Sequence, residues 1–593
     1  MRERWRNAGV VSALVVVTAL PFVFQKDTAV REWREGDPVV VVVTPMNEAI
    51  RAEYGRAFAA WHAERWGRPA KVDWRNIGGS TEIARYLESE YTSAFRAWWE
   101  GQGRRWSALA ASAILDKRFR EESRPEGVDE AAWKEAKAAR EAFRGTDDAG
   151  AFSCGLDMYF GGGAFDAESL TAEGLLVPLW GEEGAPEGLA RSADGAELIP
   201  EGMSGETWRS ATFWGTTLST FGICFNRDRM AAAGIGEAPK HWSDLGDPRW
   251  AGTLGVADPT KSGSIAKAFE TIVQVECRKA VAEGGWGEED IGRFEAAISA
   301  AGLPAGEMPA GVPAEYQTAV EEGWARGVRL LQRIGANARY FTDSASKVPL
   351  DVAAGNAAAG ICIDFYGLFE AETCNRGADG PMGYATPAGE SGVSADPISM
   401  LRGAPHRETA RRFAEFLLGE EGQKLWCYRK GESGGPEKYA LMRLPIRRDF
   451  YPGGPGEGRY EEHRAHTSRD LGSPEADAYA LAAGYVYRAR WTAGYFGTLR
   501  DLTRAMCLDS GPELKAAWRA ILAAGGPEAC PEAMAAMEAL PREPEPLTWR
   551  SGLTVGKRVE RLELLRAWTE HFRRQYREAE RLAKRKGPGA EEG

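Results

Sequence analysis

The stretch VVVVVT at Val39–Thr44 is an uninterrupted β-branched run, as expected for a parallel strand that is buried on both faces. Glu48–Trp66 follows with apolar residues at helical spacing, and Lys71–Ile77 reads as a second strand. Gly78-Gly79-Ser80-Thr81-Glu82 then opens another helix, with a hydroxyl cap and an acid in its first turn. Strands and helices that alternate with short connections predict an open α/β sheet.

Further strand candidates follow along the chain. Asp258-Pro259-Thr260-Lys261-Ser262-Gly263-Ser264 comes directly after one of them and leads into a helix from about Ile265. The candidates are Leu156–Phe160, Phe221–Asn226, Leu254–Ala257, Gly360–Phe365 and Ile398–Leu401.

Two segments depart from this alternation. Arg96–Gly150 is rich in Ala, Arg, Glu and Trp and contains no convincing strand, so it reads as an inserted helical hairpin. After about Tyr451 the chain turns to Ala-rich amphipathic helices. The last of them ends in a basic run, which we expect to be a solvated face favoured by the helix dipole, with contact to anionic lipid as the alternative. These helices are predicted at Glu475–Arg490, Tyr495–Cys507, Glu513–Ala524 and Val559–Lys586.

The composition is that of a soluble globular chain with several domains. It has 593 residues, of which 44% are hydrophobic and 27% charged. Its formal net charge is −12, and such an acidic chain is a poor general binder of nucleic acid. We therefore expect no nucleic-acid partner.

Histidine and cysteine residues give no sign of a metal site. The six His are scattered, and only His463 and His466 lie close together. They fall in the Gly- and Pro-rich stretch Tyr451–Ser473 without an HExxH frame, which predicts a solvated loop. No two of the eight Cys have CxxC spacing. The prediction is no metal and no cofactor, and the sequence leaves the pairing of the cysteines open.

The N-terminus predicts export. Arg2, Arg4 and Arg6 precede an apolar run over Ala8–Phe24, which is typical of a signal peptide. The alternative is an uncleaved signal anchor that keeps residues 8–24 in the membrane. Either reading of residues 1–30 places the rest of the chain in the periplasm or on the outer face of the cytoplasmic membrane.

Several stretches, taken in order and spacing, match a known family. They are Asp157–Gly163, Gly174–Pro178, Trp214–Leu218, Gly222–Asn226, Trp242–Leu245, Asp247–Gly252, Ala257–Ser264, Glu408–Leu418 with Gly422-Gln423, and Leu444–Arg447. With these the chain resembles the periplasmic solute-binding proteins of ABC importers, in the cluster that includes ferric-iron, polyamine and thiamine binders.

The resemblance implies a two-lobed α/β clamshell of type II that closes on a small molecule and docks on an ABC permease. It covers roughly residues 39–451 without the insertion at 96–150. Lobe 1 would comprise residues 39–220 and 384–450, and lobe 2 residues 221–383. Residues 451–593 would form an α-helical extension.

In open α/β sheets, ligands bind beyond the carboxyl ends of strands, where loops meet helix N-termini. Glycines there admit a close approach, while hydroxyls and free N–H groups favour an anion. Each loop taken alone is also explained as a helix cap or turn. The candidate ligand-binding residues are Gly79, Ser80, Thr81, Gly161, Gly162, Thr217, Thr260, Lys261, Ser262, Gly263, Ser264, Asp364 and Tyr366.

The nature of the ligand follows from two of these loops. Ferric-iron binders of the family carry two adjacent Tyr where this chain has Phe365 and Tyr366, which argues against direct iron binding. Lys261 in a hydroxyl-rich helix start favours a phosphate, phosphonate or carboxylate, whereas Asp364 would suit hydroxyls or an amine. The sequence hypothesis is a small polar organic anion, with a ferric-iron site of altered composition as an alternative.

Two other classes of function stay open. A membrane-anchored sensory or scaffolding module could use the same clamshell, with the extension contacting a partner protein. An enzyme is disfavoured, because the chain has neither a GxxxxGK[ST] run nor a GxSxG elbow. We expect no catalysis.

Overall fold

The computed structural model describes residues 31–586 except 118, 120–123, 182–183 and 376–379. The predicted export segment at 8–24 therefore lies outside the described residues. Among the described residues, no helix combines the length and apolarity that crossing a bilayer requires.

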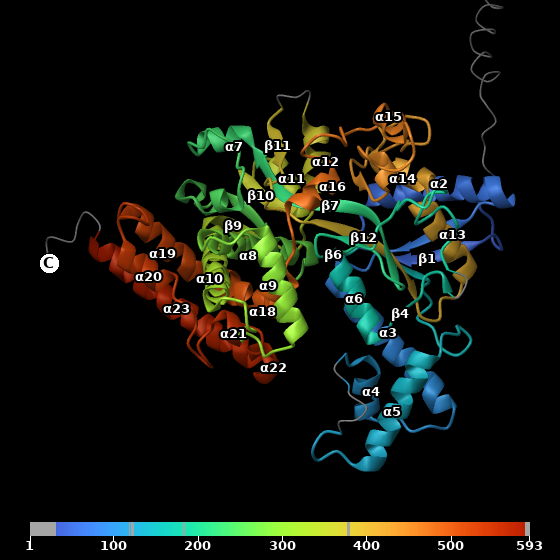
Figure 1. The fold of residues 1–593 in the computed structure, drawn as a ribbon, viewed down its shortest axis with the longest axis horizontal. Coiled ribbons are helices and arrows are strands. Elements are labelled where there is room, and N and C mark those ends of the chain that lie inside the picture. Colours follow the sequence, from blue (N-terminus) through green and yellow to red (C-terminus); the bar gives the residue numbers. More distant parts are fainter. Residues whose placement is uncertain (1–30, 118, 120–123, 182–183, 376–379, 587–593) are drawn as a thin grey trace, which may run out of the picture.

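One mixed sheet runs through the molecule in the order β2-β1-β3-β12-β7-β10-β8-β9 (Figure 1). The strand β1 pairs in parallel with β2 and β3, as the valine run predicts. The strands are β1 (Val39–Val43), β2 (Lys71–Arg75), β3 (Met158–Phe160), β4 (Leu176–Val177), β7 (Phe213–Asn226), β8 (Leu254–Ala257), β9 (Ala338–Thr342), β10 (Ala359–Ile363), β11 (Met382–Ala385), β12 (Val393–Leu401) and β13 (Leu444–Pro445).

The strand β7 joins the two halves of the sheet. Its first half pairs with β12 up to Thr220, and from Phe221 onward it pairs with β10. We call the part around β1, β3 and β12 lobe 1 and the part around β8, β9 and β10 lobe 2. The return crossing lies between β11 and β12, at residues 386–392, because β11 still pairs with the lobe 2 half of β7. The boundary predicted between residues 383 and 384, where the chain passes from lobe 2 back to lobe 1, is thus a few residues too early. This architecture confirms the two-lobed α/β fold.

Helices cover both faces of each lobe. Lobe 1 is covered by α2 (Glu48–Trp66), α13 (Arg407–Leu418) and α14 (Glu420–Cys427) on one face and by α3 (Ser80–Gly101) and α6 (Ala164–Glu173) on the other. Lobe 2 contains α7 (Arg227–Ala232), α8 (Gly263–Glu283), α9 (Glu288–Ala301), α10 (Ala314–Asn337), α11 (Lys347–Ala353) and α12 (Asp364–Cys374).

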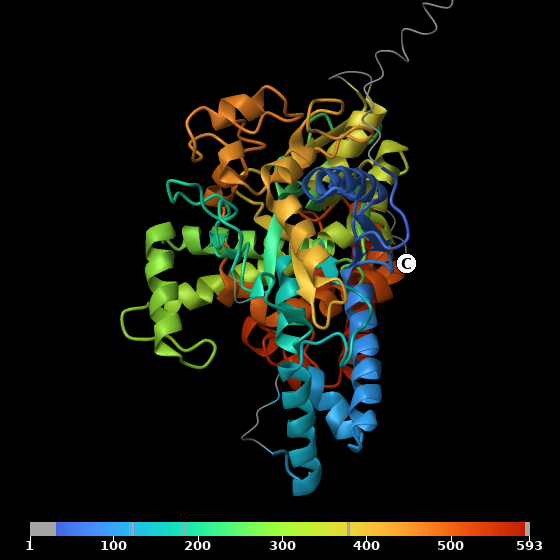
Figure 2. The same cartoon turned by 90° about the vertical axis from the view of Figure 1, so that its right-hand side faces the viewer.

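The segment predicted as a helical hairpin forms a spur. The long helix α3 runs out of lobe 1, and α4 (Ala108–Leu115) and α5 (Glu130–Gly145) pack beside it. Figure 2 shows this spur, in blue and cyan, pointing away from the sheet. Its aromatic side chains, among them Phe95 and Phe143, share one core with the outer face of lobe 1.

The chain after Tyr451 packs on both lobes. Leu471 and Tyr479 join the core of lobe 1, whereas Trp491, Tyr495 and Trp518 belong to the core of lobe 2. The extension is therefore continuous with the clamshell core. Its helices are α15 (Arg459–Arg464), α16 (Ala478–Gly484), α17 (Ala489–Thr492), α18 (Phe496–Thr503), α19 (Gly511–Ala523), α20 (Pro531–Met537), α21 (Trp549–Gly552), α22 (Val555–Arg558) and α23 (Arg561–Lys586).

The helix predicted over Glu475–Arg490 is wrong in its second half. The structure has α16, then extended backbone at residues 485–488, then α17. Two long-range bonds hold this stretch: the Tyr487 N–H donates to the Ser204 carbonyl (2.8 Å), and the Arg488 N–H donates to Gln274 Oε1 (3.1 Å). These bonds outweigh the local helical pattern.

The solvated loop predicted around His463 is also wrong. His463 lies in α15 and is fully buried. Its ring stacks on Phe450 with centroids 3.7 Å apart, and Nδ1 lies 2.8 Å from the Tyr428 hydroxyl. Burial, with the nearby Arg459 charge, lowers the pKa of His463 from 6.5 to about 4.

The titration of His463 should make stability depend on pH. Its pKa is lower in the folded state, so between pH 6.5 and 4 the unfolded chain binds the extra proton and stability falls as the pH falls. Urea unfolding at pH 7 and pH 4.5 should show the wild type losing about 2 kcal/mol more than His463→Gln, which does not titrate. Equal losses in the two proteins would contradict this account.

Candidate functional site

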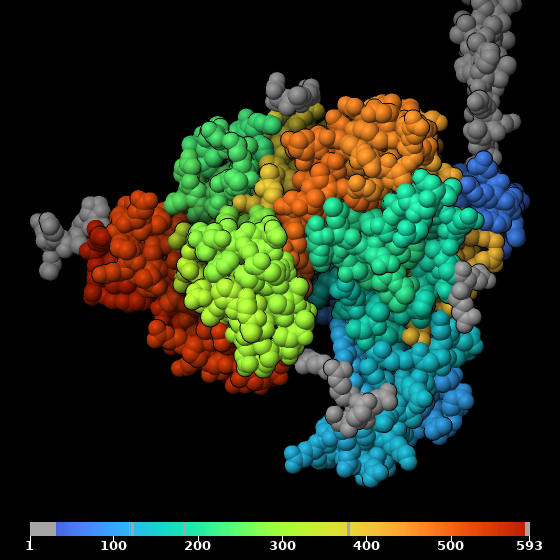
Figure 3. Space-filling model, viewed as in Figure 1, coloured from blue at the N-terminus to red at the C-terminus, as the bar shows by residue number. Residues whose placement is uncertain are grey.

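A cavity of about 410 Å³ lies between the two lobes. In the space-filling view, the teal residues of lobe 1 and the yellow-green residues of lobe 2 stand on either side of a hollow, with orange residues of the C-terminal region between them at its upper end (Figure 3). The cavity is reached by the N-terminal ends of α3, α6 and α8, each of which follows a strand of the sheet. Loops at the carboxyl ends of strands thus form its wall, as expected for an α/β sheet.

Eight of the thirteen predicted site residues line this one cavity. Ser80 and Gly162 from lobe 1 face the same space as Ser262 from lobe 2. That they bind a ligand stays a prediction. The eight are Gly79, Ser80, Gly162, Lys261, Ser262, Gly263, Ser264 and Tyr366.

The other five are not among the residues that line the cavity, and each has a hydrogen-bond or ion-pair partner within the protein. Thr217 is buried and donates to the Leu444 carbonyl (2.7 Å). Asp364 is buried in an ion pair with Arg469 (2.9 Å).

The three remaining residues of this group are each adjacent in the sequence to a residue that lines the cavity. Thr260 donates to Asp258 Oδ1 (2.7 Å), and the Thr81 hydroxyl accepts a bond from Arg500 (3.3 Å). The Gly161 N–H donates to the Pro397 carbonyl (2.8 Å).

The lobes touch at one lip of the cavity. A Cβ placed on Gly263 would lie 3.0 Å from Ser80 Oγ, and one on Gly79 would lie 3.4 Å from the Lys261 carbonyl oxygen. Gly162 is required for a further reason: its φ is +76°, and a Cβ there would lie 2.0 Å from the Tyr159 hydroxyl. Glycine is therefore required at position 162, while the short distances at Gly263 and Gly79 show how closely the two lobes approach.

The chain places a carboxylate of its own where the helix starts converge. Asp166 caps α6 by accepting from the Gly163 N–H (3.4 Å), and the Ser80 hydroxyl bonds to it from α3. Burial raises the pKa of Asp166 against the lowering effect of these bonds. The Asp166 carboxylate thus already occupies part of the region at the helix N-termini where the sequence predicts that an anionic ligand would bind.

A buried charged network forms another part of the wall. Lys267, one turn into α8, lies 2.9 Å from Glu206 and 3.1 Å from Glu270, and its ammonium is 3.7 Å from the Tyr487 ring centroid. The Tyr487 hydroxyl donates to Glu270 (2.7 Å). Burial lowers the pKa of Lys267, but the two carboxylates outweigh it and raise that pKa well above its usual value. Lys267 therefore stays charged and paired.

A second buried ion pair lies beside Tyr366. Arg443 is fully buried, bonds to Asp396 and Ser219, and stands 4.1 Å from the Phe365 ring centroid. Burial raises the pKa of Asp396 against the lowering effect of Arg443. Burial also raises the pKa of Tyr366 to about 12, so its phenol stays protonated.

Sequence reasoning missed the contribution of the extension. Tyr487, Ala489, Ala493, Phe496 and Arg500 all line the cavity. They lie far from the predicted loops in the sequence, and no local pattern marks them as site residues. The family resemblance covers only residues 39–451, so it predicts no ligand-binding residues in the C-terminal extension.

The described residues show neither a metal-binding cluster nor a disulfide bond. Within the described ranges, no group of three or more His, Cys, Asp or Glu side chains is arranged to hold a metal ion. All eight cysteines are free thiols, and six of them are buried.

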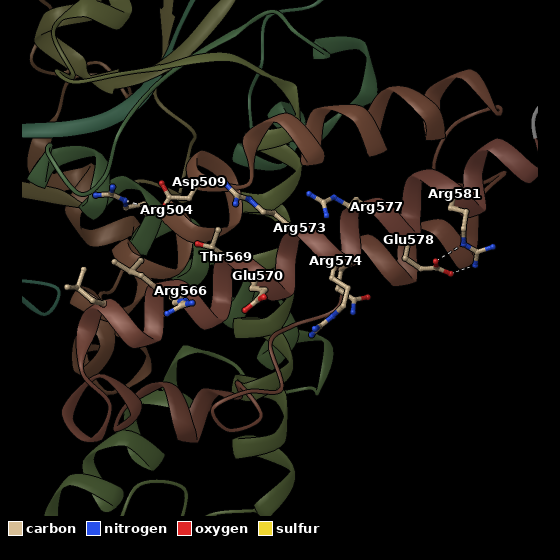
Figure 4. A pocket seen from close by; sticks show the side chains of 13 residues that line it. Arg504, Asp509, Arg566, Thr569, Glu570, Arg573, Arg574, Arg577, Glu578 and Arg581 are labelled. Atoms are coloured by element: carbon tan, nitrogen blue, oxygen red, sulfur yellow. Dashed lines mark hydrogen bonds and ion pairs between the residues drawn. The ribbon is translucent and has the colours of Figure 1, made fainter.

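A second hollow, larger than the interlobe cavity, lies elsewhere. An open groove of about 1180 Å³ follows α23, and Figure 4 shows arginines from α23 along it. Arg577, 69% exposed, pairs with Glu513 (3.0 Å), and Arg581 pairs with Glu578 on its own helix. This matches the solvated basic face expected for the last helix, and the interlobe cavity remains the candidate site.

Known proteins share parts of this chain. A protein of Haemophilus influenzae of uncharacterized function is 25% identical over 277 residues, which is 47% of this chain and 62% of the relative. The phosphoglycerate transport regulatory protein PgtC of Salmonella typhimurium is 22% identical over 208 residues, 35% of this chain and 39% of PgtC. The chain thus matches less than two thirds of the length of these relatives.

A solved structure gives a similar match. The periplasmic binding protein AfuA of Actinobacillus pleuropneumoniae, with bound fructose-6-phosphate, aligns at 14% identity and a TM-score of 0.43, covering 78% of this chain and 98% of AfuA.

The family model of bacterial extracellular solute-binding proteins matches residues 152–450. That range begins after the spur, contains β3 to β13, and ends where the extension begins. The chain therefore belongs to the bacterial extracellular solute-binding proteins.

Proposed function

We propose that this chain is an extracytoplasmic receptor that captures a small polar solute between its lobes and delivers it to an ABC permease, without catalysing a reaction. The observation that carries the proposal is the cavity at the junction of the lobes, where glycine- and hydroxyl-bearing loops from both lobes face one space. Closure around a ligand is the usual behaviour of such a hinged pair of domains.

The charges in the cavity favour a ligand with an amino group. Seven carboxylate residues line it, against three cationic residues, Lys261, Lys267 and Arg500. Four of the carboxylates already have a cationic partner: Lys267 pairs with Glu206 and Glu270, Arg443 with Asp396, and Lys347 with Asp343. Among the described residues, this leaves Glu82, Asp166 and Glu168 without an ion pair, against Lys261 and Arg500. The carboxylates are Glu82, Asp166, Glu168, Glu206, Glu270, Asp343 and Asp396.

Aromatic side chains support the same ligand class. Phe165, Phe221, Phe365, Tyr366 and Tyr487 line the cavity together with Phe496. Aromatic faces attract cations by about 0.5–2 kcal/mol, more when water is excluded. A small amine that also carries hydroxyl groups would use both the carboxylates and the serine hydroxyls.

A second candidate is the anionic solute predicted from the sequence. It is supported by Lys261, which has no ion pair among the described residues and lines the cavity beside the start of α8. An anion would have to bind close to that lysine, because the other charged residues that line the cavity are mostly carboxylates.

A thermal-shift panel separates these candidates. We expect di- and polyamines or hydroxylated amines to raise the melting temperature, since a ligand at a hundredfold excess over Kd stabilises the folded state by about 2.7 kcal/mol. The panel should also contain sugar phosphates, phosphonates, neutral sugars and Fe(III). A shift with phosphate esters alone would favour the anion over the amine, and no shift with any class would count against ligand capture.

The place of the receptor at the membrane is part of the proposal. Membership of an extracellular family supports a periplasmic location. Whether residues 8–24 are removed or kept as an anchor can be read from the intact mass of membrane-extracted protein.

A further inference from the structure

The C-terminal extension reaches the mouth of the cleft, where the two lobes meet. Its helix α18 lies against lobe 2, and Leu499 and Leu502 are buried in the lobe 2 core. From there Phe496 and Arg500 face the cavity, and Tyr487 enters from the extended stretch before α17. This later part of the extension, from about Tyr485 onward, is therefore attached to lobe 2 and presents three side chains toward the cleft.

Arg500 bonds to both lobes. Its Nε donates to the Pro259 carbonyl (2.8 Å) and its Nη2 to the Thr260 carbonyl (2.9 Å), both in the lobe 2 loop before α8. The same Nη2 donates to Thr81 Oγ1 (3.3 Å), at the start of α3 in lobe 1. Opening the lobes breaks only the last of these bonds.

An aromatic pair crosses the mouth beside Arg500. The rings of Phe496 and Phe165 have centroids 4.5 Å apart. Phe165 stands in the first turn of α6 in lobe 1 and is 49% exposed even with this contact. Phe165 loses this aromatic contact and becomes more exposed if α18 moves away.

We propose that the extension is a third wall of the ligand site, in which Arg500 and Phe496 act as a latch that holds the lobes together across the cleft mouth. The proposal rests on the proposed function only in that the closing lobes enclose the solute. The latch itself acts with or without a ligand, so it sets how readily the site opens.

The test uses the lobe 1 partners, because Arg500 is tied to lobe 2 backbone and its loss could disturb that loop. In ligand-free protein, Thr81→Ala/Phe165→Ala should raise the hydrogen-exchange rates of amides in residues 79–83 and 259–266 about tenfold. Arg561→Ala is the matched control: it removes an exposed pair with Asp501 of α18 that does not cross the cleft, and exchange at the lips should stay as in the wild type.

Equal lip exchange in the double variant and the wild type would overturn the latch, and so would a rise of the same size in Arg561→Ala. Either result leaves the thermal-shift panel free to support the receptor function. Conversely, a panel without any stabilising compound would remove the receptor function while a confirmed tenfold rise kept the latch.

Discussion

Arg443→Met is expected to lower the free energy of unfolding by about 3–5 kcal/mol. The guanidinium is fully buried, and it neutralises Asp396, whose side chain is only 13% exposed. Methionine fills much of the same space but leaves that carboxylate without a counter-ion. The loss of stability therefore comes from the Asp396 carboxylate, which is left without a counter-ion at the wall of the cavity.

Urea unfolding at neutral pH measures this effect, and two further variants identify its cause. Arg443→Met/Asp396→Asn should recover part of the loss, because the charge left behind is also removed. Arg249→Met, which breaks an exposed pair with Asp247, should cost less than about 1 kcal/mol. A loss for Arg443→Met as small as that of Arg249→Met would contradict the role given to the buried pair.

The strands with continuous apolar runs could be predicted from the sequence. Val39–Val43 and Leu254–Ala257 are strands as expected, because burial on both faces requires uninterrupted apolar residues. The first half of β7 could not be recognised in this way. Residues Thr216 and Thr217 interrupt its apolar pattern, and both are buried because their hydroxyls donate to carbonyls of neighbouring strands.

The candidate site, too, could be predicted only in part from the sequence. Loops at strand ends, such as Gly79-Ser80 and Lys261–Ser264, could be predicted because the sheet itself brings them together. Contacts such as Tyr487 with Glu270 and Arg500 with Thr81 join residues more than two hundred positions apart. No periodicity or local motif encodes them, so the extension's share of the wall emerges only from the tertiary structure.

The proposed preference for an amine also depends on the tertiary structure. Lys261 stands in a hydroxyl-rich loop, and taken locally that loop favours an anion. In the folded chain, the carboxylates of Glu82, Asp166 and Glu168, which have no ion pair among the described residues, come to line the same cavity from two separate segments. The summed charge of the wall decides which ligand is attracted, and single loops do not reveal that sum.

Ser262→Trp is expected to weaken ligand binding at least about tenfold, or 1.4 kcal/mol. Ser262 caps α8 and lines the cavity at the lip where Gly263 meets Ser80. An indole there would fill ligand space and hold the lips apart. Ser107→Trp is the matched control, because Ser107 caps α4 in the spur, far from the cleft.

Calorimetric titration of these two variants with the compound that most raises the melting temperature tests ligand capture between the lobes most directly. The account predicts at least about tenfold weaker binding for Ser262→Trp and wild-type affinity for Ser107→Trp. Unchanged affinity in Ser262→Trp would show that the solute binds elsewhere.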